Sequence, residues 1–383
     1  MRITNVKTYV VGNPWKNWVF VKIETDAGIT GWSEATMGLS TRPVEAAIHE
    51  MRSLFIGADP CRINRLWDDL YKGLFLATGS VPVTAMTALE IGCWDILGKA
   101  LNAPVHQLLG GKMRDRIRAY ANGWYQGPRD PAFFADRAQQ VAAMGYTALK
   151  FDPFGSAYQY LDRDEERLSL RIVAAVRQAV GDGVDLLIEG HDRFSVSTAV
   201  RLGHALAEFR PMWFETPTLS TDIAATAEVA RQIPVPVASG ERFTTLTEFR
   251  ELLATGVIDI IQPETLHAGG LIGGRKIAGL AEAHGAAVAP HNAQSPLATL
   301  ANVHLDATLP NVLIQEVFDD FLAPWARQIL HGCPAIRDGY LEVPDRPGLG
   351  IEVDEAALAA YPYHEKHFLR LFEAGWERRT GGR

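Results

Sequence analysis

The chain of 383 residues has few cysteines, few basic residues and no long apolar runs. Its three cysteines, Cys61, Cys93 and Cys333, are odd in number and far apart, which argues against a disulfide framework or a thiolate zinc site. The 37 Lys and Arg residues are outnumbered by 45 Asp and Glu residues, giving a net charge of −8. A broad basic surface is therefore not expected, and we predict no nucleic-acid partner.

Membrane attachment is also not expected from the sequence. No uninterrupted apolar stretch reaches the roughly 18 residues that a spanning helix needs, and the first residues show no apolar run of signal-peptide length. We therefore expect a cytoplasmic protein without a membrane partner. The remaining composition, 47% hydrophobic and 21% charged, is typical of a globular chain with a sizeable core.

The N-terminal part reads as a mixed α and β unit. Val19–Thr25 is strand-like, a turn at Gly28 follows, and Ile29–Glu34 resembles the returning strand. The clearest helix pattern covers Pro82–Leu101. We predict an N-terminal α+β domain over residues 1–115.

From residue 116 onward, short apolar runs alternate with amphipathic helical patterns. Eight runs are strand candidates: Ile117–Ala121, Thr147–Lys150, Asp185–Glu189, Met212–Glu215, Val235–Ser239, Ile258–Gln262, Ala286–Ala289 and Val312–Gln315. Eight such units predict parallel strands closed into a TIM-type α/β barrel over residues 116–330. Residues 331–383 are predicted to pack back on the N-terminal domain, with Glu377–Arg383 as a fraying end.

Titratable side chains recur where the predicted strands end. They follow one another at spacings of 23 to 27 residues, one strand–helix unit each: Glu189, Glu215, Glu241, Glu264, His291 and Glu316, with Lys150 on the second strand. The carboxyl ends of barrel strands form the mouth where such enzymes hold their active sites. Solubility alone does not explain a charged ring in a concave, partly desolvated place.

Three of these residues form a candidate metal site. Glu189, Glu215 and Glu241 end consecutive strands, and three carboxylates without cysteine or histidine favour one Mg²⁺, or Mn²⁺, over zinc. Two alternatives stay open. The carboxylates could form a hydrogen-bonded cluster held by Lys150 and Arg242, or two of them could act as a glycosidase pair, which leaves the third glutamate and the histidines without a role.

The remaining mouth residues are candidate proton carriers. Lys150 and His291 come from opposite sides of the predicted barrel, so a metal-bound substrate would meet one on each face. Glu264 can orient the His291 ring as in a tuned base. His191, two residues past the first predicted ligand, is placed to act as an acid, and Glu316 can hydrogen-bond to the substrate or to a developing oxyanion.

Motifs along nearly the whole chain resemble the mandelate racemase branch of the enolase superfamily. They are residues 94–100 (WDILGKA), 104–111 (PVHQLLGG), 213–217 (WFETP), 239–242 (SGER), 262–264 (QPE), 267–270 (HAGG), 289–291 (APH) and 347–351 (PGLGI). The resemblance implies a capping domain over a modified barrel of the (β/α)7β type. It also implies a Mg²⁺ ion that binds a substrate carboxylate, and removal of the α-proton through an enediolate.

Within that branch the pattern is most similar to sugar-acid dehydratases of the galactonate type. The resemblance implies that His291 abstracts the C2 proton, that Glu264 orients it, and that His191 protonates the departing 3-hydroxyl. The expected activity is dehydration of an aldonate, such as galactonate or gluconate, to a 2-keto-3-deoxy acid. Asp152 and Asn292 are predicted substrate contacts, and a homo-oligomer is expected.

Four positions depart from the family pattern. Glu189 and Glu264 stand where aspartate is usual, Thr216 follows Glu215 in place of a second glutamate, and Asp152 replaces the second lysine of a Lys-x-Lys pair. Without that lysine, Lys150 becomes an electrostatic contact, and a two-base racemase is disfavoured. The rival predictions are a racemase, epimerase or cycloisomerase of a hydroxy acid or sugar lactone, and a non-catalytic barrel that binds an acid or a metal.

Overall fold

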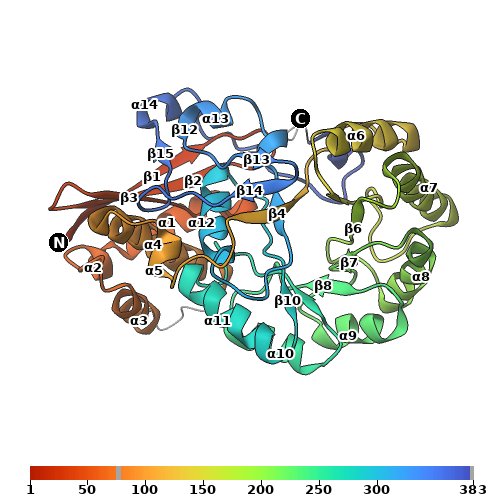
Figure 1. Ribbon diagram of the computed structural model, residues 1–383, viewed down its shortest axis with the longest axis horizontal. Helices are drawn as coiled ribbons and strands as arrows, with labels where there is room; N and C mark the ends of the chain where they lie inside the picture. Colours follow the sequence, from red (N-terminus) through yellow and green to blue (C-terminus); the bar gives the residue numbers. More distant parts are fainter. Residues whose placement is uncertain (75–78, 380–383) are drawn as a thin grey trace.

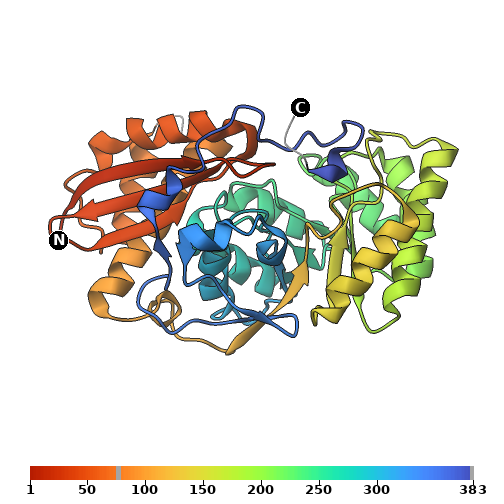
Figure 2. The same ribbon diagram turned by 90° about the horizontal axis from the view of Figure 1, so that it is seen from above.

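The computed structural model describes residues 1–74 and 79–379. Figure 1 shows a barrel of strands ringed by helices, with a separate N-terminal domain beside it. In the perpendicular view, the N-terminal domain and the barrel lie next to each other, and the C-terminal segment runs from one to the other across the top (Figure 2).

The N-terminal domain combines an antiparallel sheet with a helical layer. Its strands are β1 (Ile3–Val11), β2 (Trp18–Thr25) and β3 (Thr30–Glu34), paired in the order β1-β2-β3. Its helices are α1 (Thr41–Glu50), α2 (Arg52–Phe55), α3 (Ile63–Gly73), α4 (Ser80–Leu101) and α5 (Val105–Leu108). The sequence predicted β2, β3 and α4; strand β1 was missed. Helix α4 is buried along most of its length because it packs between this sheet and the barrel.

The second part is the predicted modified barrel. Its strands are β4 (Arg116–Ala121), β5 (Ala148–Phe151), β6 (Asp185–Glu189), β7 (Trp213–Glu215), β8 (Val237–Ser239), β9 (Ile260–Ile261), β10 (Ala287–Val288) and β11 (Gln315–Val317). They pair in parallel from β4 to β10 in chain order, and β11 pairs with β4. A parallel bridge between Val288 and Val312 completes the ring.

Helices cover the outside of the barrel. They are α6 (Pro131–Ala143), α7 (Arg163–Val180), α8 (Val196–Leu206), α9 (Ile223–Gln232), α10 (Leu246–Ala254), α11 (Gly270–Ala283) and α12 (Pro296–Asp306). Helix α10 begins with a capping box, in which the side chains of Thr245 and Glu248 each accept a hydrogen bond from the other's backbone N–H group. The α-helix that comes next after β11 is the short α13 (Ala326–Ile329), so the eighth unit has no full-length helix among the described residues.

The first turn of α11 holds the barrel against the N-terminal domain. The Glu90 carboxylate on α4 accepts hydrogen bonds from the backbone N–H groups of Leu271 (3.1 Å) and Ile272 (3.0 Å), where a helix favours negative charge. Gly270 lies so close that a Cβ atom there would meet Glu90 Oε2 at 2.0 Å. The glycine-rich run at residues 269–274 therefore begins helix α11 and allows the two domains to pack closely.

The chain after the barrel returns to the N-terminal domain. Short strands β12 (Leu330–His331), β13 (Ile336–Arg337), β14 (Tyr340–Glu342) and β15 (Glu352–Val353) and helix α14 (Glu355–Leu358) follow one another. Glu355 forms an ion pair with Lys22 and accepts a hydrogen bond from the Tyr9 hydroxyl. The Asn17 side chain donates a hydrogen bond to the backbone oxygen of His364 (2.9 Å). Among the helices in the described ranges, none has both the length and the apolarity to cross a bilayer.

Candidate active site and metal centre

Three glutamates converge at the carboxyl ends of neighbouring strands. Glu189 and Glu215 are the last residues of β6 and β7 and lie side by side in the parallel ladder, and Glu241 follows β8 by two residues. One carboxylate oxygen from each lies within 4.8 Å of the others. Oxygens that share an Mg²⁺ at about 2.1 Å are at most about 4.2 Å apart, so a small inward movement of these side chains would let them share one ion.

The backbone around the triad adopts conformations that few side chains tolerate. His191, Asp192 and Thr216 all have positive φ angles, of 50°, 56° and 35°. Such residues cost roughly 1–3 kcal/mol each and persist where surrounding contacts impose them. Here Glu189 Oε1 accepts a hydrogen bond from the backbone N–H of His191 (2.6 Å) and another from the Thr216 hydroxyl (2.7 Å). The strain places these groups around the first glutamate.

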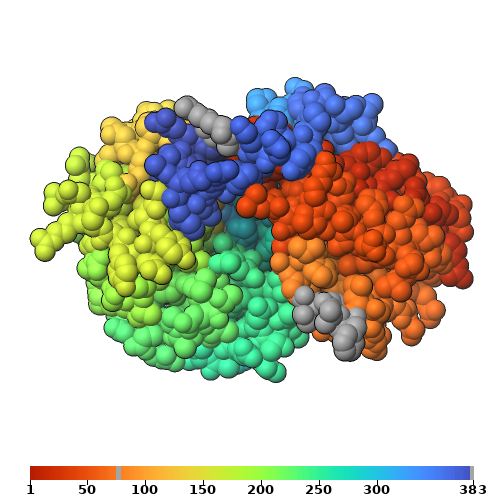
Figure 3. Space-filling view, turned by 180° about the vertical axis from the view of Figure 1, so that it is seen from behind, coloured from red at the N-terminus to blue at the C-terminus, as the bar shows by residue number. Residues whose placement is uncertain are grey.

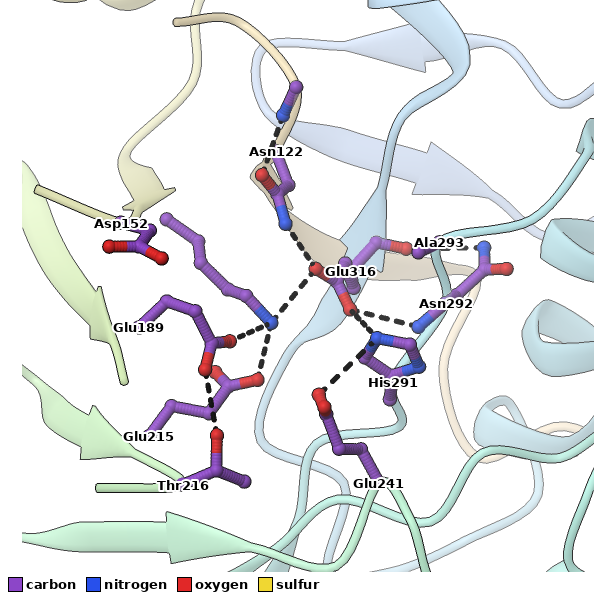
Figure 4. Close-up of polar contacts among 12 residues, drawn as sticks. Asn122, Asp152, Glu189, Glu215, Thr216, Glu241, His291, Asn292, Ala293 and Glu316 are labelled. Atoms are coloured by element: carbon purple, nitrogen blue, oxygen red, sulfur yellow. Dashed lines mark hydrogen bonds and ion pairs between the residues drawn. The ribbon is translucent and has the colours of Figure 1, made fainter. Parts of the chain in front are cut away.

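A single lysine ammonium lies among the carboxylates. Lys150 on β5 is 2% exposed, and its Nζ lies 3.0 Å from Glu189, 3.1 Å from Glu316 and in contact with Glu215. Figure 4 shows these contacts as dashed lines that run from the ammonium to Glu189 and Glu215 on one side and to Glu316 on the other. Burial opposes the charge on Lys150, but the three carboxylates outweigh it and raise the pKa well above its usual range.

The negative charge of the cluster exceeds what the nearby cations balance. Burial disfavours every carboxylate, yet Lys150 and neighbouring histidines hold the pKa of Glu189 below its usual range and that of Glu316 at about 2. Burial and the charge of Glu189 raise the pKa of Glu215 well above its usual range. Three carboxylates with surplus negative charge are a donor set that fits Mg²⁺.

The structure has only one of the two contacts expected for a carboxylate cluster held by Lys150 and Arg242. Lys150 does bridge the carboxylates, but Arg242 does not reach them: it pairs with Asp192 (2.5 Å), which also accepts from Ser220 (2.7 Å). Glu241 has no contact with Lys150 either, and its charged neighbour is His291 Nε2 at 3.4 Å. Among residues 1–74 and 79–379, no lysine or arginine thus pairs with this corner of the triad.

His291 lies beside the triad and is oriented by Glu264. Its Nδ1 is 2.8 Å from Glu264 Oε2, which leaves Nε2 facing Glu241 and Glu316 (3.4 and 3.8 Å). Glu264 and His291 lie on the neighbouring chain segments that extend β9 and β10 by a parallel bridge. Burial lowers the pKa of His291, but the surrounding carboxylates raise it overall, to about 9.

His191 lies next to Glu189 and is held by an aspartate. Its Nδ1 is 2.6 Å from Asp152 Oδ2, and Asp152 is fully buried in an ion pair with Arg193. Asp152 also accepts from the Phe154 backbone N–H (2.8 Å). The His191 side chain keeps 19% of its surface exposed. Each histidine therefore has a carboxylate on Nδ1 and a free edge at the mouth.

Asn292 and Glu316 form a connected pair on the far side of Lys150. The Asn292 backbone N–H donates to Glu316 Oε2 (2.9 Å), and its side-chain amide donates to Thr299 (2.8 Å). Asn122, which follows β4, donates to Glu316 Oε1 at 2.7 Å. The structure thus brings together all ten residues predicted for the site, from seven successive strands.

Several neighbours of the site were not identified from the sequence. Trp213 donates its indole N–H to Glu215 (2.8 Å), and Arg193 holds Asp152. Lys16, from the N-terminal domain, donates to the backbone oxygen of Ala293, two residues past His291 (3.0 Å). Lys16 lies between Trp15 and Trp18 in a loop of the N-terminal domain, and this pair of tryptophans is the signal that could have identified it.

The C-terminal segment is the largest correction. Glu377–Arg383 was predicted to fray because of its charge and glycine content. Residues 380–383 lie outside the described residues, but Trp376, Glu377 and Arg379 are 5%, 2% and 6% exposed. Aromatic side chains of the barrel and the N-terminal domain pack against Trp376 and Arg379. Figure 3 shows this segment beside the hollow where the N-terminal domain and the barrel meet.

Comparison with known families covers both parts of the chain. Residues 5–110 match the family described as mandelate racemase/muconate lactonizing enzyme, N-terminal domain. Residues 134–357 match the family described as enolase C-terminal domain-like. The two matches leave uncovered the chain ends and residues 111–133, which include the first barrel strand β4.

Individual relatives agree with these matches. A D-gluconate dehydratase of Thermoproteus tenax is 37% identical, over 91% of this chain and 70% of its own length. A D-gluconate/D-galactonate dehydratase of Picrophilus torridus is 35% identical, over 98% of this chain and 97% of its own. A crystal structure of a mandelate racemase/muconate lactonizing enzyme-like protein from Roseovarius sp. TM1035 has a TM-score of 0.88 and 37% identity, covering 95% of this chain and 96% of its own.

Proposed function

Because the chain belongs to the mandelate racemase branch of the enolase superfamily, we propose that it is a Mg²⁺-dependent dehydratase of an aldonic-type sugar acid. One observation carries the proposal: two histidines, each oriented by its own carboxylate, flank an acidic triad. The relatives named as gluconate and galactonate dehydratases support the substrate class.

The triad of Glu189, Glu215 and Glu241 would hold the metal. Bound there, Mg²⁺ would supply positive charge against the negative charge that develops on a substrate carboxylate when its α-proton leaves. Lys150 contributes a second fixed positive charge beside Glu189 and Glu316. Glu316, fixed by Asn122 and Asn292, is placed to accept a hydrogen bond from a substrate hydroxyl.

The two histidines divide the proton transfers. His291 removes the C2 proton through Nε2, because Glu264 occupies Nδ1 and so fixes the tautomer. His191 donates a proton to the 3-hydroxyl, which leaves as water. The resulting enol becomes the 2-keto-3-deoxy acid. Asp152 holds the His191 ring, so it acts here as a positioning residue, and Asn292 acts through Glu316.

A racemase or epimerase fits the geometry less well. A two-base mechanism needs a second neutral base opposite His291, and the lysine on β5 is kept charged by three carboxylates. A non-catalytic barrel would have no reason to orient two histidines in this way.

The test is a screen of sugar acids with added Mg²⁺ and with EDTA, followed by proton NMR. A dehydratase yields a new C3 methylene pair and a product lighter by one water, and EDTA abolishes both. Glu241→Gln should lose metal binding and turnover together, whereas Glu282→Gln, on the outer helix α11, should change neither. Epimer formation without a methylene would favour the racemase, and no turnover on any acid would overturn the proposal.

A further inference from the structure

The C-terminal segment carries a buried cation that the proposed chemistry does not use. Arg379 is 6% exposed, and its Nη2 donates to the Tyr125 hydroxyl at 3.2 Å. Its Nε and Nη1 have no hydrogen-bond partner among residues 1–74 and 79–379. Buried guanidinium donors are nearly always satisfied, by protein, water or ligand. Two unsatisfied donors on one buried arginine therefore point to a missing oxygen-bearing partner.

The walls around this guanidinium come from both domains. Its Cζ lies 5.1 Å from the Trp15 ring centroid, 5.3 Å from that of Tyr125 and 5.0 Å from that of Phe318. Aromatic faces attract a cation but accept no directed hydrogen bond of ordinary strength. The rings hold the guanidinium in place and leave its N–H groups available.

These neighbours place Arg379 at the mouth of the barrel. Tyr125 follows β4, and Phe318 directly follows β11, the strand that carries Glu316. Trp15 lies next to Lys16, whose ammonium contacts the chain two residues past His291. The guanidinium thus lies between the loops of the first and last barrel strands, under the N-terminal domain.

The same segment also touches the second histidine. The Trp376 ring packs edge-on against His191, with centroids 5.7 Å apart, and its indole N–H donates to the Gly155 backbone (2.9 Å). Residues 376–379 therefore line the site from the proposed acid to Arg379. His191 in turn contacts Glu189 of the triad, so this wall lies beside the place where a substrate carboxylate would be held.

We propose that Arg379 is a substrate-binding residue, whose guanidinium donates hydrogen bonds to oxygen atoms at the end of a linear sugar acid remote from its carboxylate. The inference rests on the proposed function and deepens it: the C-terminal segment sets the length and hydroxylation of the acid that the enzyme accepts. The buried positive charge would also select a second carboxylate at that end, as in an aldaric acid.

The experiment separates the two ends of the substrate. For the wild type and Arg379→Met, KM is measured for six-carbon aldonates and for a six-carbon aldarate. The inhibition constant of a four-carbon aldonate, which lacks the remote end, is measured alongside. Hydrogen bonds to charged groups predict a 10- to 100-fold rise in KM for the six-carbon acids, with the four-carbon inhibition constant unchanged within about threefold. Arg378→Met, an exposed neighbour, should change neither constant.

Further variants guard against misfolding. Arg379→Lys keeps the charge and the stem over the rings but loses the directed donors, so KM for six-carbon acids should rise several-fold. Tyr125→Phe removes only the hydroxyl that holds Nη2 and should raise the same KM more modestly. If Arg379→Met does not fold, the contrast between six-carbon and four-carbon acids in Arg379→Lys decides.

The outcomes distinguish this inference from the proposed function. A wild-type enzyme that dehydrates a sugar acid, combined with equal changes for long and short acids or with no change in either, makes Arg379 a structural residue and overturns the inference alone. If KM rises in Arg379→Met for the aldarate alone, the substrate is a dicarboxylic acid, and the result supports the inference. No turnover of any sugar acid by the wild type overturns the proposed function and the inference together.

Discussion

Lys150→Met tests whether one buried ammonium holds the carboxylate cluster together. The lysine side chain is 2% exposed and contacts Glu189, Glu215 and Glu316. Methionine keeps much of the length and apolar stem and removes the charge. Removing one partner of a buried ion pair costs about 3–5 kcal/mol, because the remaining charge stays buried and uncompensated. We expect the free energy of unfolding at pH 7 in EDTA to fall by that amount.

The matched control is Lys72→Met. Lys72 pairs with Asp68 at 2.8 Å on helix α3, but its side chain is 72% exposed, so the loss should stay below about 1 kcal/mol. Both variants are unfolded in urea with EDTA and again with Mg²⁺. Added Mg²⁺ should stabilise Lys150→Met more than the wild type, since the triad then lacks its only lysine.

The pH dependence of the free energy of unfolding tests the same reasoning a second time. The pKa values of Glu189 and Glu316 are lowered in the folded chain, so their contribution to stability is present above the unfolded value near 4.3 and is lost as the pH falls further. In Lys150→Met these groups take up protons more readily. The stability gap to the wild type should therefore narrow as the pH falls from 7 to below about 4. Equal losses for the Lys150 and Lys72 variants at pH 7 would refute the reasoning.

Three further predictions concern the histidines. His291→Asn should abolish turnover while keeping Mg²⁺ binding, and persistent exchange of the C2 proton with solvent in that variant would contradict its assignment as the base. In EDTA, the raised pKa of His291, about 9, means that its contribution to stability is complete below about pH 6.5 and is lost as the pH rises through 9. The stability difference between the wild type and His291→Asn should shrink over that interval, and a constant difference would argue against the carboxylate environment. His191→Asn should lower dehydration by about 10²- to 10⁴-fold while C2 exchange continues; loss of both would show that His191 is needed before the C–O bond breaks.

Several features of the site follow from spacing alone. Parallel strands of a barrel end at the same mouth, so a titratable residue every 23 to 27 positions had to converge there, and Glu189, Glu215 and Glu241 do. The eight predicted strands all overlap observed ones. The observed strands end earlier than predicted where few residues pair near the mouth. Strands β9 and β10 have two residues each, and Glu264 and His291 lie three residues beyond their ends. The last strand was placed too early, since only Gln315 of its predicted range is in β11.

Other features required the folded chain. The sequence left two partners open for Lys150, the substrate or the carboxylate cluster. The structure shows its ammonium paired with three carboxylates, because a buried charge is costly unless an opposite charge lies beside it. Asp152 replaces a lysine in the family pattern, and only the packing of β5 against β6 shows that it holds His191.

The sequence by itself determined the barrel, its mouth and the three glutamates that converge there, because strand periodicity and the spacing of one such residue per strand–helix unit are local properties of the chain. The tertiary structure alone decided which charges pair, and that the C-terminal Trp376 and Arg379 enclose the site. Those residues are about 60 positions beyond the last barrel strand, and no local pattern encodes a contact made only when distant segments meet.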